Sequence, residues 1–231
     1  MTFIATFKRS IKLSLRWLKD RTSRMQFANK KKNALEFPYS IPISQEIKPS
    51  ETFENKVFNL SLAAQAINQI IIQPNEVFSF WKIVGNPSKG YKKSRSIQNG
   101  KVTEDIGGGL CQVSGIIYHA SILAGLEIIE RYNHSLDLYT DETRFTPLGL
   151  DATVVYGYKD LRVKNKHPFP IYFELTVEQN NISIQVKSEK ELLPIQLFFE
   201  MQTAGTNIIV QVKDVNGKLI NTSNYLKINL L

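Results

Sequence analysis

The spacing of apolar residues changes from helical to strand-like after Leu126, and this change constrains the fold more than any other feature. Before it, helical spacing predicts one helix from about Asn55 to Ile70 and another from Val113 to Leu123, with Gly125 as its stop. After it, short runs of β-branched and aromatic residues predict strands: Ile128 and Ile129, Leu136 to Tyr139, Thr153 to Tyr156, Leu161 to Val163, Ile171 to Val177, Ile182 to Val186 and Asn207 to Val212. Helices followed by an antiparallel sheet predict the α+β class.

The chain has 231 residues, enough to bury a core without disulfides or metals. We predict four segments: a helix over 1–32, a connector over 33–54, a core domain over 55–190 and a C-terminal β extension over 191–231. The connector contains Pro38, Pro42 and Pro49, and the extension has a hairpin turn at Asn216 and Gly217. The polar stretch from Lys92 to Asp105 is predicted to be a loop over a site.

Residues 1–32 have the pattern of a basic amphipathic helix. Apolar residues recur there at intervals of three, four and seven, with basic residues between them: Phe3, Ile4, Phe7, Ile11, Leu15 and Leu18 against Lys8, Arg9, Lys12, Arg16 and Lys19. The formal net charge of +8 is concentrated in this segment, since the remainder is nearly balanced. Such a helix either lies on an anionic membrane surface or packs on its own domain with a solvated basic face.

Location and partners follow from the same segment. No uninterrupted apolar stretch has the length of a signal peptide or a membrane span, which predicts a cytoplasmic protein, peripheral at the inner membrane face if the helix binds lipid. No zinc-finger spacing or aromatic RNA-binding motif accompanies the charge. We therefore expect no nucleic-acid partner.

Cys111 is the only cysteine, so the chain can form neither an intramolecular disulfide nor a multi-cysteine zinc site. It falls in the first turn of the second predicted helix, directly after Gly107, Gly108 and Gly109. A helix start carries unpaired N–H groups and partial positive charge, which lower the pKa of a thiol and stabilise an oxyanion. This position predicts a nucleophile.

His134 and Asp151 follow in the order that a thiol enzyme needs, the first as base and the second as the acid that orients it. Hairpin pairing of the strands beside them would bring both to the helix start. We expect the substrate or the oxyanion to be bound by the glycine run and by two residues of the helix, namely Gly107, Gly108, Gly109, Gln112 and Ser114, with main-chain N–H groups contributing.

Each of these residues also has a structural explanation. A lone cysteine is often a small buried hydrophobe, and three glycines can serve only to make a tight turn. His134 can fill a polar niche, and Asp151 can accept main-chain N–H groups in a turn. His119, inside the helix, and His167, before a proline, are weaker candidates for the base.

No metal and no cofactor is expected. Zinc held by Cys111, His134 and Asp151 is a minor alternative, because this mixed set lacks a second ligand motif. The glycine run lacks both the Lys-Ser/Thr ending of a phosphate-binding loop and the spacing of a dinucleotide fingerprint.

Several motifs together resemble the VanW family. They are the sequences Gly-Gly-Gly-Leu-Cys-Gln-Val-Ser from Gly107 to Ser114, Asn-His-Ser from Asn133 to Ser135 and Gly-Leu-Asp-Ala-Thr-Val from Gly149 to Val154. Two departures lie beside the site: Gly115-Ile116-Ile117 stands where members commonly carry Thr-Thr-Leu, and the stretch from Asp141 to Pro147 is longer than usual. The resemblance implies a bacterial protein associated with glycopeptide resistance and the cell envelope, and it leaves the activity unsettled.

Two functions fit these observations. The first is a thiol-dependent acyl transferase or hydrolase acting on an envelope-related amide or ester, similar in the order of its residues to papain-like and transglutaminase-like enzymes. The second is a non-catalytic accessory protein whose pocket binds a cell-wall peptide, glycan or lipid-linked precursor. In both, the expected partner is a cell-wall-related small molecule or peptide, and a membrane surface is a further candidate partner through residues 1–32.

Overall fold

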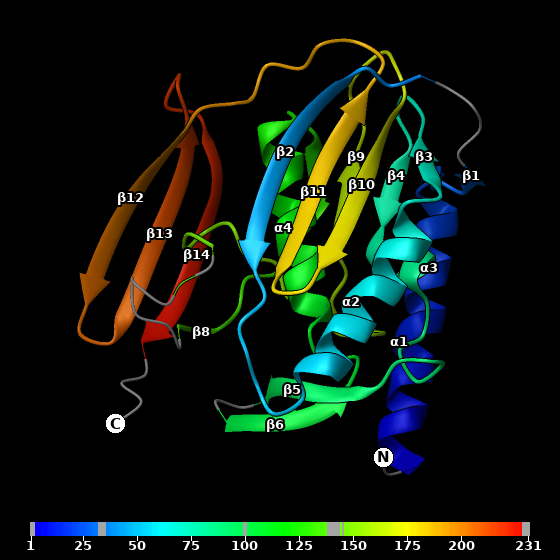
Figure 1. Cartoon of the computed structure of the whole chain (residues 1–231), viewed down its shortest axis with the longest axis vertical. Coiled ribbons are helices and arrows are strands. Elements are labelled where there is room, and N and C mark those ends of the chain that lie inside the picture. Colours follow the sequence, from blue (N-terminus) through cyan, green and yellow to red (C-terminus); the bar gives the residue numbers. More distant parts are fainter. Residues whose placement is uncertain (1–2, 32–35, 99–100, 138–143, 145, 228–231) are drawn as a thin grey trace.

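The computed structural model describes residues 3–31, 36–98, 101–137, 144 and 146–227, and these form a mixed α+β fold (Figure 1). The helices in these ranges are α1 (Phe3–Thr22), α2 (Phe53–Ile67), α3 (Phe80–Val84) and α4 (Leu110–Leu123). The predicted class is therefore confirmed.

A five-stranded sheet forms the centre of the molecule. Its strands run antiparallel in the order β1 (Lys30–Lys31), β3 (Ile70–Ile72), β10 (Ile171–Glu178), β11 (Asn181–Ser188) and β2 (Tyr39–Glu46). Helix α4 packs against β2 and β11, and α2 packs against β10 and α4 (Figure 1).

Smaller sheets surround this centre. The strands β4 (Val77–Ser79), β9 (Arg162–Lys164) and β7 (Glu127–Glu130) form an antiparallel sheet, and β5 (Lys93–Gln98) pairs with β6 (Lys101–Ile106) in a hairpin. The C-terminal strands β12 (Leu197–Ala204), β13 (Asn207–Asp214) and β14 (Leu219–Lys227) form a meander, and β14 pairs in parallel with β8 (Leu136–Asp137). The C-terminal sheet is thus joined to the middle of the chain through β8.

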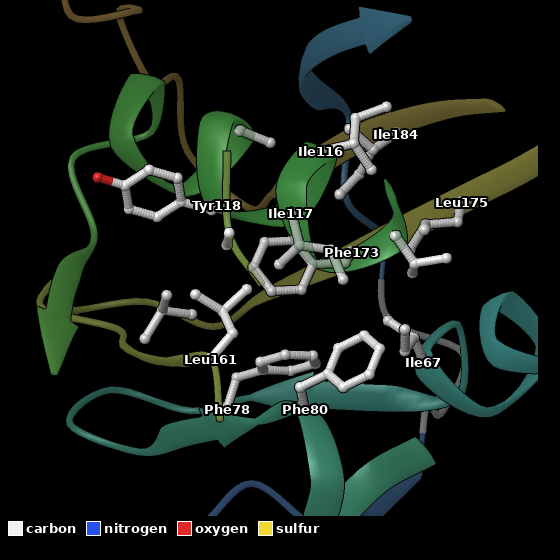
Figure 2. Packing of buried hydrophobic residues seen from close by; sticks show 14 of the residues in the cluster. Ile67, Phe78, Phe80, Ile116, Ile117, Tyr118, Leu161, Phe173, Leu175 and Ile184 are labelled. Carbon is white, nitrogen blue, oxygen red and sulfur yellow. The ribbon is translucent and has the colours of Figure 1, made fainter. Parts of the chain in front are cut away.

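The core is built around α4, which is buried on almost all sides, as expected for a helix that is apolar around its circumference. Ile116 and Ile117 are fully buried in the same cluster as Phe78, Phe80 and Phe173 (Figure 2). The rings of Phe78 and Phe173 meet edge to face with centroids 5.2 Å apart. Because α4 is held from several sides, its first turn is fixed in space.

Two segments that were predicted to be irregular are strands. Residues 39–46, inside the predicted connector, form β2, which tolerates Pro42 because it is an edge strand and one side of an edge strand needs no ladder hydrogen bonds. Residues 93–106, predicted as a loop, contain the β5–β6 hairpin. The strands were not predicted because most side chains of this hairpin are polar, so the sequence has no alternation of apolar and polar residues there. Conversely, residues 153–156 were predicted to be a strand but form an extended loop with a single bridge from Val155 to Lys159.

Helix α1 packs on the core through its polar face. Arg16 forms two hydrogen bonds with Glu130, of 2.6 and 2.9 Å, and Asp20 accepts two from Arg162, of 2.6 and 3.1 Å. Arg162 also donates to Asp160 at 3.0 Å. These charges therefore form one network between α1 and the sheet of β4, β9 and β7. Among the described helices none is long and apolar enough to cross a membrane.

Asn59 on α2 fixes the β5 strand and the glycine turn that precede α4. Its fully buried amide donates to Lys92 O at 2.9 Å and to Gly108 O at 3.0 Å, and accepts from Lys92 N at 2.8 Å. We expect Asn59→Ala to lower the free energy of unfolding by about 2 to 4 kcal/mol, because the buried Gly108 carbonyl and the part-buried Lys92 N–H both lose their Asn59 partner. Chemical denaturation measures this change.

Asn55→Ala is the matched control, since Asn55 lies one turn earlier on α2 and donates a single exposed hydrogen bond to Lys93 O. Its expected cost is about 1 kcal/mol or less. Equal losses in the two variants would show that the Asn59 hydrogen bonds do not stabilise the turn.

Candidate active site

Cys111 is the second residue of α4, and its side chain is half-buried. Its Sγ lies 3.5 Å from Thr153 Oγ1 and 3.7 Å from Val154 O. As a thiol, Cys111 can donate to the Val154 carbonyl, and as a thiolate it can accept from the Thr153 hydroxyl. The helix start adds partial positive charge beside the sulfur.

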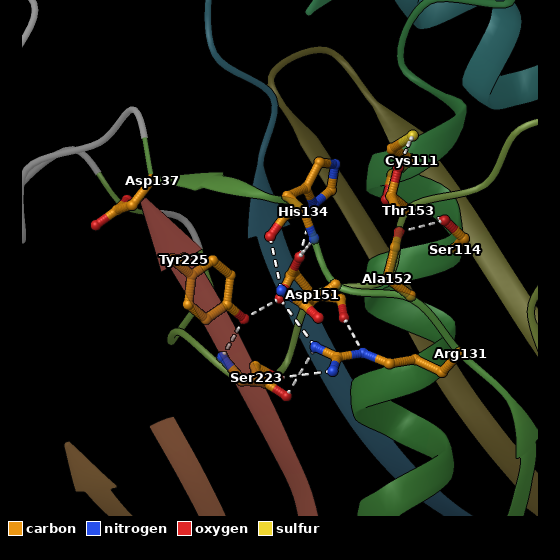
Figure 3. Close-up of polar contacts among 12 residues, drawn as sticks. Cys111, Ser114, Arg131, His134, Asp137, Asp151, Ala152, Thr153, Ser223 and Tyr225 are labelled. Carbon is orange, nitrogen blue, oxygen red and sulfur yellow. Dashed lines mark hydrogen bonds and ion pairs between the residues drawn. The ribbon is translucent and has the colours of Figure 1, made fainter. Parts of the chain in front are cut away.

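His134 stands between Cys111 and Asp151. Its Nδ1–H donates to Asp151 Oδ2 at 2.6 Å, and its own main-chain N–H donates to the same oxygen at 2.7 Å. The ring lies near enough to Cys111 for each side chain to shift the pKa of the other. Because the His134 side chain is 41% exposed, a molecule arriving from solvent can reach the pair. The structure therefore brings together the three residues predicted to be catalytic (Figure 3).

The other Asp151 oxygen is held by Arg131 and Tyr225. Arg131 Nη2 donates to Oδ1 at 3.0 Å and Nε donates to the Asp151 main-chain oxygen at 2.8 Å, while the Tyr225 hydroxyl donates to Oδ1. Arg131 in turn donates to Ser223 Oγ at 2.7 Å (Figure 3). Asp151 thus accepts hydrogen bonds at both oxygens, and its orientation toward His134 is fixed.

The charges of the three groups support one another. Burial raises the pKa of Cys111, but the hydrogen bond and charge of His134, with smaller contributions from Val154 and Thr153, outweigh it and lower the pKa. Burial lowers the pKa of His134, but Asp151 and Cys111 outweigh it and raise the pKa to about 10. Burial raises the pKa of Asp151, but His134 and Arg131 bring it down to about 2. The lowered pKa of the thiol and the raised pKa of the imidazole both favour a thiolate–imidazolium pair over the neutral pair.

The three glycines that precede Cys111 lie in a tightly packed turn. A Cβ added to Gly108 would stand 2.4 Å from Ser94 O, and one on Gly109 would stand 2.7 Å from a Leu60 methyl. Gly109 also has φ +98, and Gly107 has φ +81, which favour glycine. Chain packing therefore explains why these positions are glycines. The space that a side chain would need at each of them is occupied by residues of β5, of α2 and of neighbouring segments of the chain.

The side chains of Gln112 and Ser114 also make hydrogen bonds that stabilise the fold. The nearly buried Gln112 donates through Nε2 to Glu46 O at 2.8 Å, which ties α4 to the end of β2. Ser114 Oγ donates to Ala152 O at 2.7 Å and so holds the segment that carries Asp151 against α4. A direct role for Gln112 at an oxyanion would require its present hydrogen bond to break.

The other two histidines lie elsewhere. His119 is half-buried on α4, and burial lowers its pKa to about 4. His167 bonds through Nε2 to Ala124 O at 2.7 Å and stacks on Phe169. Within the described ranges, no group of three or more His, Cys, Asp or Glu side chains is arranged to hold a metal ion.

Sequence reasoning did not identify Arg131 and Tyr225 as part of the site. Arg131 lies three residues before His134, and this proximity is the one signal that could have marked it. Tyr225 lies 74 residues after Asp151 in the C-terminal sheet, so no local pattern relates the two.

A thiol at the start of a buried helix, with an imidazole and a carboxylate from two later loops, defines the class of protein: an α+β fold with a Cys-His-Asp site. Comparison with known families then places it more closely. The family described as VanW like protein matches residues 55–187, more than half of the chain. The chain belongs to the VanW family.

Two relatives illustrate the similarity. The chain is 36% identical over 140 residues to the vancomycin B-type resistance protein VanW of Enterococcus faecalis (strain ATCC 700802 / V583), which covers 60% of this chain and 51% of that protein. It is 41% identical over 120 residues to the uncharacterized protein YoaR of Bacillus subtilis (strain 168), which covers 51% of this chain and 38% of that protein. The matched part of the chain thus spans about half of the first relative and 38% of the second, and no solved structure matches the chain.

The hydrogen bond to Asp151 is expected to control the protonation of His134. In the wild-type protein the ring should stay protonated well above pH 7, with a pKa near 10, and Asp151→Asn should bring this pKa down toward the reference of about 6.5. NMR titration of the ring measures both values. The His119 and His167 signals serve as internal controls, and an unchanged His134 titration in Asp151→Asn would contradict the assigned pairing.

Proposed function

We propose that this chain is a thiol-dependent acyl transferase or hydrolase acting on an envelope-related amide or ester. The observation that carries the proposal is the pairing of His134 with Asp151 at 2.6 Å beside a thiol whose pKa is lowered. Family membership supports the envelope context, since the name of the Enterococcus relative refers to vancomycin resistance.

In the first proposed step, the Cys111 thiolate attacks the carbonyl carbon of the substrate and forms a C–S bond. The carbonyl oxygen takes the displaced electron pair, and the main-chain N–H of Cys111 is the donor proposed to stabilise it, because the N–H groups of Leu110 and Gln112 already donate to Gly107 O and Gly109 O. The imidazolium of His134 then gives its proton to the departing amine or alcohol as the scissile bond breaks. The product is a thioester on Cys111.

In the second step, water or an acceptor amine or alcohol attacks the thioester. His134, now neutral, takes the proton of the attacking group, and the C–S bond breaks to restore the thiolate and imidazolium. Asp151 keeps Nδ1 protonated throughout, so that Nε2 is the nitrogen that exchanges the proton. Water gives hydrolysis and another nucleophile gives transfer.

The order of the three residues supports this proposal by analogy. A nucleophile at a helix start followed in the chain by histidine and aspartate is similar to papain-like and transglutaminase-like thiol enzymes. The analogy concerns the order and the placement of the residues, and the chemistry rests on the geometry of the site itself.

Alkylation of Cys111 by a small soluble reagent tests the nucleophile, and because the chain has a single cysteine the signal has one source. A thiol with a lowered pKa reacts at lower pH, so the rising limb of the rate against pH should lie below the reference of about 8.5. In His134→Ala the favourable partner is gone and burial remains, which raises the pKa. At pH 6 we expect alkylation of the wild type to be at least about tenfold faster than that of His134→Ala.

His119→Ala is the matched control, since His119 is another half-buried histidine, on α4 itself. It should leave the pH profile unchanged. An ordinary or unreactive thiol in both the wild type and His134→Ala would exclude the proposed nucleophile, and the site would then be tested for ligand binding. If the pH profile of Cys111 alkylation is shifted as expected, turnover of cell-wall peptides is measured next. Cys111→Ser should abolish this turnover.

A further inference from the structure

Helix α1 exposes its apolar residues to solvent. Phe7, Ile11, Leu15 and Leu18 are between 45% and 60% exposed, and their spacing places them along one side of the helix. A surface helix of a globular protein ordinarily packs its apolar stripe against the core. Here the four side chains remain largely exposed instead.

The opposite side of α1 makes the contacts with the core. It carries Arg16 and Asp20, which pair with Glu130 and Arg162, and Leu13, which lies beside Gly157. The guanidinium of Arg9 stands 5.9 Å from the ring centroid of Tyr156. These contacts hold α1 in one orientation at the edge of the molecule, away from the C-terminal sheet (Figure 1).

Exposed cations flank the apolar stripe. Lys8, Lys12 and Lys19 lie along one border, and Arg21 lies on the other, near Trp17. The single acid of the helix, Asp20, is buried and paired with Arg162, so it does not offset the charge of the exposed side. Two copies of this surface would place lysines against lysines, which disfavours self-association.

We propose that α1 binds the surface of an anionic lipid bilayer and lies parallel to it. Phe7, Ile11, Leu15 and Leu18 would enter the boundary between head groups and acyl chains, and the flanking cations would contact anionic head groups. Trp17 lies at the side of the stripe, where indole rings favour the interface. The helix is held by the folded domain in the orientation that this contact needs.

Flotation of the 231-residue chain with phosphatidylcholine vesicles, with and without phosphatidylglycerol, tests the proposal. The wild type should float with the vesicles that contain phosphatidylglycerol, less so at high salt, and remain in solution with the neutral ones. The fluorescence of Trp17 should shift to the blue on binding, and Trp17→Phe should abolish the shift because Trp81 lies on α3.

Two variants separate the apolar and electrostatic contributions. Ile11→Ser with Leu15→Ser should weaken binding by an order of magnitude or more, while each of Lys8→Gln, Lys12→Gln and Lys19→Gln should weaken it roughly fivefold. Leu193→Ser, at an exposed leucine outside α1, is the matched control and should bind like the wild type. Circular dichroism checks that each variant is folded. We expect all of them to fold, because the substituted side chains are exposed.

Three results would overturn the proposal. Binding that survives Ile11→Ser with Leu15→Ser but not loss of the lysines would be adsorption by charge alone. A wild-type dimer in lipid-free solution that these serines convert to a monomer would make the stripe an interface between copies. If the protein binds neither kind of vesicle, the apolar stripe does not bind lipid, and a protein partner would have to cover it.

Discussion

The carboxylate of Asp151 is the interaction on which the site depends. A buried charge is costly unless it is paired and hydrogen-bonded, and Asp151 meets this condition through three residues from two parts of the chain. Two donors come from His134, one from Arg131 and one from Tyr225. Because both oxygens are occupied, the His134 ring is held in one tautomer and one orientation beside the thiol.

The position of Cys111 is set by packing and owes little to the polar groups around it. Helix α4 is buried between the central sheet and its neighbours, and the glycine turn before it fits against β5 and α2 with no room for side chains. The Asn59 amide fixes the same turn from α2. The fold therefore supplies a rigid helix start, and the loops that carry His134 and Asp151 are brought to it by hydrogen bonds such as the one from Ser114 to Ala152.

The sequence predicted the residues that meet at the site better than it predicted what holds them. Cys111, His134 and Asp151 were identifiable because each belongs to a short motif, and their proximity agrees with the order of the chain. Tyr225 was not identifiable, since only tertiary pairing of β14 with β8 brings it to Asp151. For α1, periodicity predicted the helix but not its orientation, because the partners of Arg16 and Asp20 lie on β7 and β9, more than 100 residues away. Strand β2 was missed because Pro42 within it, together with Pro38 and Pro49 on either side, suggested a connector.

The support of Asp151 by the C-terminal sheet has a consequence for the order in which the protein matures. A chain is synthesised from its N-terminus at about 5 to 20 residues per second, so the 74 residues between Asp151 and Tyr225 take about 4 to 15 s to appear. During that interval Cys111, His134 and Asp151 all exist, but the tyrosine that completes the carboxylate's partners does not. The full set of hydrogen bonds to the Asp151 carboxylate therefore forms only after β14 has been synthesised, and a nascent chain carries Cys111, His134 and Asp151 before it carries all the groups that hold them.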